Sequence, residues 1–164
     1  MVDEIGTRPG LVVLEDSWMR YLRLSCTATI VLTPAWWFVH RMRLKSVDAR
    51  VNYRLHHVAL RASSYSTAFG FGLGTVAAFS KALYYQWDIE RVVIEAVSIR
   101  CDKQVDLYNK MTARCGVAGL FLVLPLTEGG GILTRSARGF GLGVVAGIPA
   151  AYYRLDTAFS VLAG

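Results

Sequence analysis

The chain has 164 residues, of which 54% are hydrophobic and 18% charged, and its mean hydropathy is +0.37. A soluble domain usually carries about 25% charged residues, so this composition favours a lipid environment over water. The net charge of +6 would suit a nucleic-acid-binding protein. However, the basic residues follow neither an RNA-binding nor a zinc-finger pattern, which argues against that class.

Residues 1–21 are predicted to form a polar, slightly acidic N-terminal segment. Gly6, Pro9 and Gly10 are expected to break any early helix. The acidic residues of this segment are the wrong sign for a cleavable, arginine-rich transit peptide. If the protein reaches an organelle, we therefore expect it to do so on internal signals.

Charged residues are nearly absent from four stretches and crowd the intervals between them. A charge at the centre of a bilayer costs roughly 2.5–3.5 kcal/mol, so this segregation is typical of membrane spans. The sequence predicts an all-α integral membrane domain over residues 22–160, with four short transmembrane helices. The spans are expected at about residues 22–40, 65–85, 107–126 and 137–155, and the limits of the third are left open because its apolar run is short.

A basic stretch follows the first predicted span. It contains six basic residues up to Arg61, opposed only by Asp48. Such stretches commonly bind anionic lipid headgroups, so a bound phospholipid such as cardiolipin is expected here. His56 and His57, as sequence neighbours on a helix, are expected to point apart and not to share a metal ion. The predicted headgroup contacts are Arg41, Arg43, Lys45, Arg50 and Arg54.

Small residues recur at every fourth position in the second and fourth spans. On a helix this spacing produces a narrow groove in which another backbone can approach closely, and such packing replaces the hydrophobic effect inside lipid. The two stripes are predicted to receive helices of other subunits or lipid tails. Their members are Ser66, Gly70, Gly74, Ala78 and Ala82, and Gly139, Gly143, Gly147 and Ala151.

The two stripes also indicate an internal repeat. Residues 70–77 read GFGLGTVA and residues 139–146 read GFGLGVVA, and ten of seventeen positions are identical between 68–84 and 137–153. A duplication in which each half supplies one plain and one glycine-striped helix explains this similarity.

No arrangement of side chains in the sequence indicates catalysis. Lys81 is the one charge within the second span, and it is expected to extend to the membrane interface. No acidic pair lies within a span, and we expect neither a metal, a cofactor nor a small-molecule substrate. Cys101 and Cys115 flank one polar segment, and whether they form a disulfide is left open.

The loop charges predict the orientation. Basic residues concentrate in the first loop, with a small excess in the third. The positive-inside rule places both loops on the inner side, with both termini outside.

A motif ahead of the third span resembles a known family. Arg100, Lys103, Asp106 and Asn109, followed by Gly116 and Gly119, are similar to the Arg-x-Lys-x-Asp-x-x-Asn signature of the mitochondrial inner-membrane Tim translocase superfamily. The Asp-to-Asn spacing matches, whereas the two preceding intervals are each one residue longer. A simpler role for Asp106 and Asn109, as caps of the third helix, stays open.

The resemblance covers roughly residues 22–160 and implies a function. It is strongest to the branch that supplies an accessory subunit of complex I, NADH:ubiquinone oxidoreductase. It implies a multi-pass, non-catalytic subunit of the mitochondrial inner membrane with both termini in the intermembrane space, whose partners are membrane subunits of a large complex and lipids. A protein-import translocase subunit and an ATP synthase accessory subunit are the alternatives.

Overall fold

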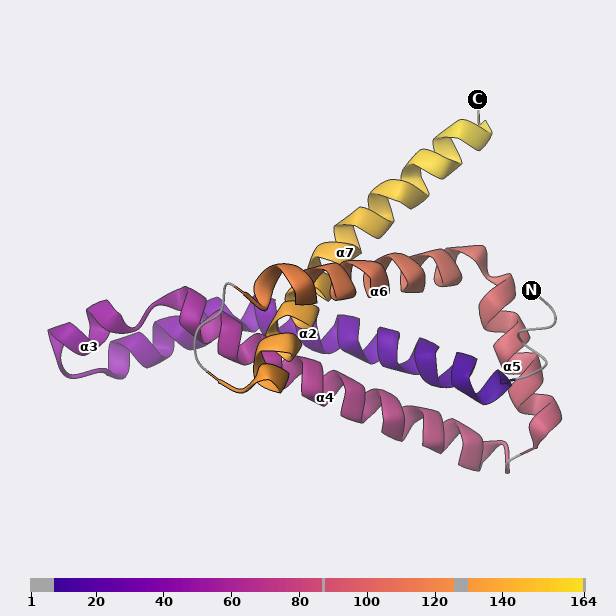
Figure 1. Ribbon diagram of the computed structural model, residues 1–164, viewed down its shortest axis with the longest axis horizontal. Coiled ribbons are helices and arrows are strands. Elements are labelled where there is room, and N and C mark those ends of the chain that lie inside the picture. Colours follow the sequence, from indigo (N-terminus) through magenta and orange to yellow (C-terminus); the bar gives the residue numbers. More distant parts are fainter. Residues whose placement is uncertain (1–7, 87, 126–129, 164) are drawn as a thin grey trace.

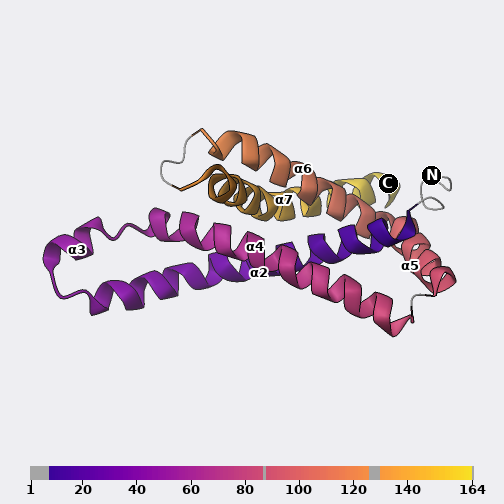
Figure 2. The same ribbon diagram turned by 60° about the horizontal axis from the view of Figure 1, so that its bottom comes forward.

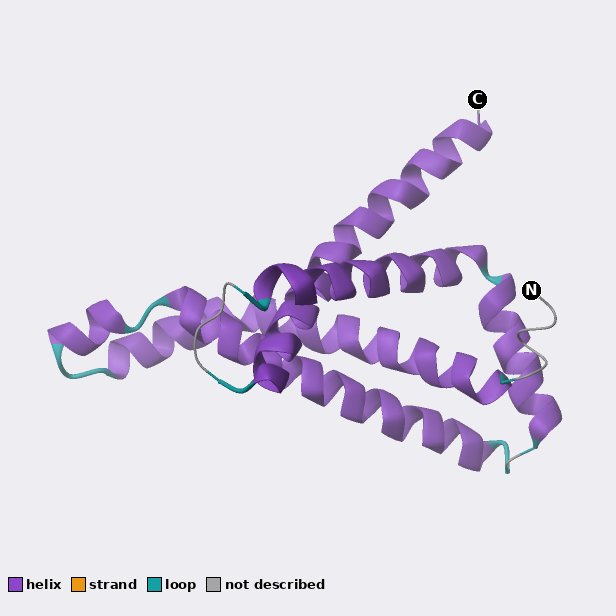
Figure 3. Cartoon of the chain, viewed as in Figure 1, coloured by secondary structure: helices purple, strands orange, loops and turns teal. Residues whose placement is uncertain are grey.

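We describe the protein from a computed structural model, in which residues 8–86, 88–125 and 130–163 are described. Every regular element in these ranges is a helix, which confirms the all-α class (Figure 3). The helices are α2 (Pro9–Arg43), α3 (Val47–Asn52), α4 (Leu55–Tyr84), α5 (Ile89–Cys101), α6 (Lys103–Val123) and α7 (Ile132–Ala163).

The four long helices form two antiparallel pairs. α2 packs mainly against α4, and α6 packs mainly against α7, while a smaller contact joins α4 to α7. Figure 2 shows the α6–α7 pair lying over the α2–α4 pair as a second layer. The pairing therefore follows the two halves of the internal repeat.

The first helix begins earlier than the sequence predicts. α2 starts at Pro9, so the expectation that Pro9 and Gly10 break an early helix is wrong for these residues. Proline suits the first turn, because the backbone N–H that it lacks has no partner there in any helix. Residues 9–21 are thus continuous with the predicted first span, and Gly6 lies outside the described residues.

The register of the first pair shifts the predicted spans against each other. The backbone of Leu22 faces Gly70, and that of Trp18 faces Gly74. At the far end of the pair, the indole Nε1 of Trp37 donates to the carbonyl oxygen of Tyr53 at 2.8 Å. The glycine stripe of α4 therefore packs on the N-terminal half of α2, and the predicted spans 22–40 and 65–85 overlap only in part.

α5 lies across the end of the bundle beside the start of α2 (Figure 1). Ala96 of α5 is fully buried and packs with Val12 and Val13 of α2. Asp102 ends α5 and caps α6, since its carboxylate accepts hydrogen bonds from the backbone N–H groups of Gln104 and Val105. The helix cap is therefore Asp102, and the alternative role that was left open for Asp106 and Asn109, as caps of this helix, does not hold.

The helix ends divide into two groups. α2 ends, α4 begins, α6 ends and α7 begins toward the end of the molecule that carries α3 (Figure 2). The start of α2, all of α5 and the later part of α7 lie toward the other end. The C-terminal half of α7 extends away from the remaining helices (Figure 1).

Candidate functional site

The glycine stripe of α4 forms a close seam with α2. A Cβ atom added to Gly70 would lie 2.9 Å from the Cα of Leu22, and one added to Gly74 would lie 2.8 Å from the Cα of Trp18. Ordinary carbon contacts are about 3.5–4.0 Å, so only glycine allows this approach. Beside the seam, the indole Nε1 of Trp18 donates to the hydroxyl of Thr75 at 2.9 Å.

The stripe of α7 forms an equivalent seam with α6. A Cβ on Gly139 would lie 2.8 Å from the Cα of Leu120, and a Cβ on Gly147 would lie 2.9 Å from that of Thr112. At Gly143 the added atom would meet the carbonyl oxygen and carbon of Cys115. Backbone faces backbone at Gly139 and Gly143, so no side chain there can move aside to make room, whereas the side chain of Cys115 also lies close to Gly147.

The remaining stripe residues fall into two groups. Ser66 and Ala151 are buried within the bundle, whereas Ala78 and Ala82 are half-buried. These two alanines line a small apolar cavity of about 310 Å³ between α2, α4 and α5.

Sequence reasoning missed three packing glycines. Gly116 and Gly119 of α6 complete the α7 seam. Gly141 faces the other way, toward the hydroxyl of Ser63 on α4, which itself donates to the carbonyl oxygen of Arg138 at 3.1 Å. The spacing of Gly139 and Gly141 could have indicated this second contact, because residues two apart on a helix point in nearly opposite directions.

The chain's own helices therefore occupy both seams. The backbone of α2 fills the Gly70–Gly74 part of one stripe, and α6 fills the other stripe from Gly139 to Gly147. The expectation that these stripes receive helices of other subunits or lipid tails is wrong for these positions. Any contact with another subunit has to use the outer faces of the helices.

The family-like motif of α6 contributes to a buried polar cluster with α2. Asp16 is 1% exposed, and the side-chain amide of Asn109 donates to its carboxylate at 2.9 Å. The guanidinium of Arg23 donates to the amide oxygen of Asn109 at 2.6 Å and lies 4.4 Å from the ring centre of Tyr108. Asn109 thus links an acidic and a basic residue of α2 to the second helix pair.

Two further motif residues form an ion-pair chain at the start of α6. The guanidinium of Arg100 contacts Asp106 at 2.6 Å and Glu15 of α2 at 3.0 Å, and Asp106 also accepts from Lys110 at 2.6 Å. Lys103 is exposed. The structure therefore joins Arg100 and Asp106 directly, with Asn109 nearby, and the shared role of these motif residues is to attach α5 and α6 to α2.

Lys81 pairs with α5. Its ammonium lies 2.7 Å from the carboxylate of Glu95, which also accepts from the hydroxyl of Tyr85 at 3.3 Å. The hydrogen bond from Lys81 holds the pKa of Glu95 below its ordinary value. The predicted role of Lys81 at the membrane interface is untested, but its partner is a carboxylate within the chain.

The predicted headgroup residues lie at the α3 end of the molecule. The guanidinium of Arg41 stacks 4.9 Å from the ring centre of Trp37, and Arg50 donates to the carbonyl oxygen of Leu44 at 2.7 Å. Arg43, Lys45 and Arg54 complete this basic end and are exposed or nearly so.

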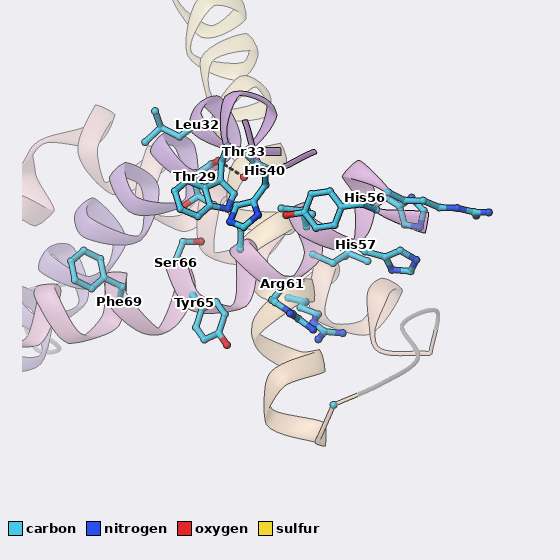
Figure 4. Close-up of a pocket in the computed structure, with 18 of the residues that line it drawn as sticks. Thr29, Leu32, Thr33, His40, His56, His57, Arg61, Tyr65, Ser66 and Phe69 are labelled. Carbon is cyan, nitrogen blue, oxygen red and sulfur yellow. Dashed lines mark hydrogen bonds between the residues drawn. The ribbon is translucent and has the colours of Figure 1, made fainter. Parts of the chain in front are cut away.

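A large groove opens beside the basic end. Its volume is about 1610 Å³, and it lies between the C-terminal part of α2, the N-terminal part of α4 and the start of α7. Figure 4 shows Leu32 and Phe69 toward one end of this groove and His56, His57 and Arg61 toward the other.

The histidines and cysteines differ in part from expectation. The rings of His56 and His57 lie with their centres 4.1 Å apart, so the prediction that they point apart is wrong. Among the described residues, no group of three or more His, Cys, Asp or Glu residues is placed to hold a metal ion. Cys101 and Cys115 are both free thiols, which answers the open question of a disulfide.

No family model matches the chain, and no curated protein or solved structure matches it either. Of the helices that the structure describes, α2 alone is both long and apolar enough to cross a membrane when judged by length and composition. Some core helices of soluble proteins satisfy the same criterion.

Proposed function

We propose that this chain is a non-catalytic subunit embedded in the mitochondrial inner membrane, where it joins a respiratory complex. NADH:ubiquinone oxidoreductase is the first candidate host. One observation carries the membrane part of the proposal: small and polar side chains fill the interior, while large apolar side chains cover the exterior.

The interior has little of the apolar volume that holds a soluble bundle together. Its buried polar residues include Asp16, Thr33, Asn109 and Thr112, and the fully buried apolar side chains are few. Polar and small residues at helix interfaces are the usual means of helix association inside lipid, where apolar side chains gain nothing by facing each other.

The exterior carries the apolar side chains that a soluble protein would bury. Val31 of α2 is 68% exposed, and Phe121 and Leu122 of α6 are 70% and 68% exposed. Soluble monomers rarely expose connected apolar patches larger than a few hundred Å². Lipid tails or apolar neighbouring subunits would cover these faces. Further members of the exposed set are Leu24, Ile30, Leu32, Phe69, Val76, Phe79, Leu83 and Val117.

The arrangement of the helix ends supports the proposed topology. The basic first loop lies at the same end as the end of α6 and the start of α7, as four alternating spans require. By the positive-inside rule this end faces the matrix, and both termini face the intermembrane space. Protease protection of tags at the two termini in intact mitoplasts tests this orientation, since protected termini would contradict it.

The proposed non-catalytic role rests on which helices the packing glycines and the paired polar residues connect. The glycine seams, the Asp16–Asn109 cluster and the Arg100 ion pairs all join helices of this chain to one another. The apolar exterior is the surface that no other part of the chain covers, and it suits attachment to larger membrane subunits. The host itself is proposed from the Arg100–Asn109 motif and its resemblance to the complex I branch of the Tim superfamily.

Gentle detergent extraction followed by a native gel tests the proposal. The tagged chain should remain in the membrane at alkaline pH and migrate with NADH dehydrogenase activity. Release by alkaline carbonate would contradict membrane embedding. Migration with another respiratory complex, such as ATP synthase, would change the host and leave the membrane role intact.

One observation favours a second function. Import channels of the same superfamily present a polar concave groove, and here a groove of about 1610 Å³ is lined by Thr29, Thr33 and Ser66. A protein-import translocase subunit is therefore the alternative. A photo-crosslinker at Thr29 that captures an arrested preprotein would support this alternative, and capture only of respiratory subunits would support the first.

A further inference from the structure

The groove beside α3 has a pronounced charge asymmetry. Its lining includes Arg54, Arg61 and Arg138, together with His40 and the adjacent rings of His56 and His57. Of the groove-lining residues that the structure describes, none is acidic. The groove therefore complements an anion, and its arginines match the geometry of phosphate oxygens.

The same groove changes from basic to apolar along its length. His56, His57 and Arg61 occupy one end in Figure 4, and Leu32 and Phe69 occupy the other. Leu32 and Phe69 are 63% and 62% exposed. A ligand that fits both ends is amphiphilic, with an anionic head and an apolar body.

The size of the groove indicates the kind of amphiphile. Pockets for drug-sized molecules measure about 300–1,000 Å³, and this groove is larger, at about 1610 Å³. Between the two ends, the lining of the groove includes Thr29 of α2 and Tyr65 of α4 (Figure 4). Hydroxyl groups of this kind suit the ester region between a headgroup and its acyl chains.

We infer that this groove is a binding site for one anionic phospholipid, whose phosphate lies at Arg61 and His57 and whose acyl chains run past Phe69. The inference rests on the proposed membrane placement, since the ligand comes from the surrounding bilayer. It differs from general attraction of lipid to the basic loop, because Arg43 lies in that loop but does not line the groove.

The test uses the purified full chain in detergent micelles and native mass spectrometry. Phosphatidylglycerol and phosphatidylcholine with identical acyl chains are the probes. We expect the wild-type chain to retain phosphatidylglycerol preferentially. An arginine near a lipid surface contributes about 1 kcal/mol, so Arg61→Gln should weaken retention about fivefold.

Matched variants separate the groove from its surroundings. Arg43→Gln removes the same charge from the basic loop outside the groove and should weaken retention less than Arg61→Gln does. Phe69→Ala should weaken retention of both lipids, whereas Phe121→Ala, an equal change on α6, should not. Equal losses for Arg61→Gln and Arg43→Gln would overturn the inference, as would equal retention of the two lipids by the wild-type chain.

A separate measurement, made on membranes before detergent is added, distinguishes this inference from the proposed function. Alkaline carbonate extraction reports on membrane embedding, and lipid retention reports on the groove. A chain that resists extraction but shows no preference for phosphatidylglycerol contradicts the lipid site alone. Addition of inorganic phosphate should not displace the bound lipid, and displacement would assign the groove to a free anion instead.

Discussion

The substitution Gly143→Ala tests the seam between α6 and α7. The added methyl group would lie 2.8 Å from the carbonyl carbon of Cys115 and 2.9 Å from the Cα of Gly116. Ordinary carbon contacts are about 3.5–4.0 Å, so the two helices must separate by at least about 0.7 Å. Because both neighbours are backbone, this separation extends along the seam, and overpacking of this kind costs roughly 1–3 kcal/mol.

Gly72→Ala is the matched control. Gly72 lies within α4, and an added Cβ would meet nothing within 4 Å. Alanine is the better helix former by about 0.8–1.0 kcal/mol, so this variant should be slightly more stable than the wild-type chain.

Thermal unfolding in detergent micelles, followed by the circular dichroism of the helices, measures both variants. A change of 1 kcal/mol shifts the midpoint by roughly 2–4 °C in a chain of this size. The same gain in helix propensity offsets part of the overpacking at Gly143, so Gly143→Ala should lower the midpoint by about 3 °C, while Gly72→Ala should raise it by about 2–3 °C. If the two alanines shift the midpoint in the same direction by similar amounts, the seam does not exist as described.

Two further perturbations test the polar contacts. Asn109→Ala removes the amide that donates to buried Asp16, so it should lower the free energy of unfolding by about 1–3 kcal/mol in the same thermal assay. Its control, Lys110→Ala, loses only an exposed ion pair and should lower it by less than about 1 kcal/mol. The pKa of Glu95 lies below its ordinary value of 4.5, so the stabilisation from Lys81 should be complete above about pH 4.5 and be lost as the pH falls through the lowered pKa. A pH series should show this acid-side loss in the wild-type chain and a flatter curve in Glu95→Gln; identical curves would contradict the pairing.

The two glycine seams show that the small-residue stripes pack against helices of the same chain. Small residues at a spacing of four predict close helix approach, but the pattern does not say whether the approaching helix belongs to the same chain. Here α2 and α6 occupy the stripes at Gly74 and Gly143. The outer faces, with side chains such as Val31 and Phe121, stay exposed, and under the proposed function lipid or other subunits would cover them.

The internal repeat also diverges in three dimensions. Gly72 and Gly141 occupy equivalent positions in the two copies of the repeat. Gly141 faces Ser63 of α4, whereas a Cβ added to Gly72 would meet nothing within 4 Å. The two copies therefore share their seams within each pair, but only the second copy contributes a glycine to the contact between the pairs.

Local features of the sequence determined the helices and the glycine seams, because charge segregation and a spacing of four act within one helix. The start of α2 was mispredicted from Pro9 and Gly10, since both residues are tolerated in a first turn. The sequence also singled out Asp106 and Asn109 through a motif, but it did not indicate which residues they contact.

Only the tertiary structure decided the register between helices and the partners of the polar residues. Asn109 and Asp16 are 93 positions apart, and Lys81 meets Glu95 from another helix. These contacts depend on how the two helix pairs are placed over each other and how α5 crosses their end. The physical reason is that a helical period specifies which face of a helix is buried, while the neighbour that buries it follows from the packing of the whole chain.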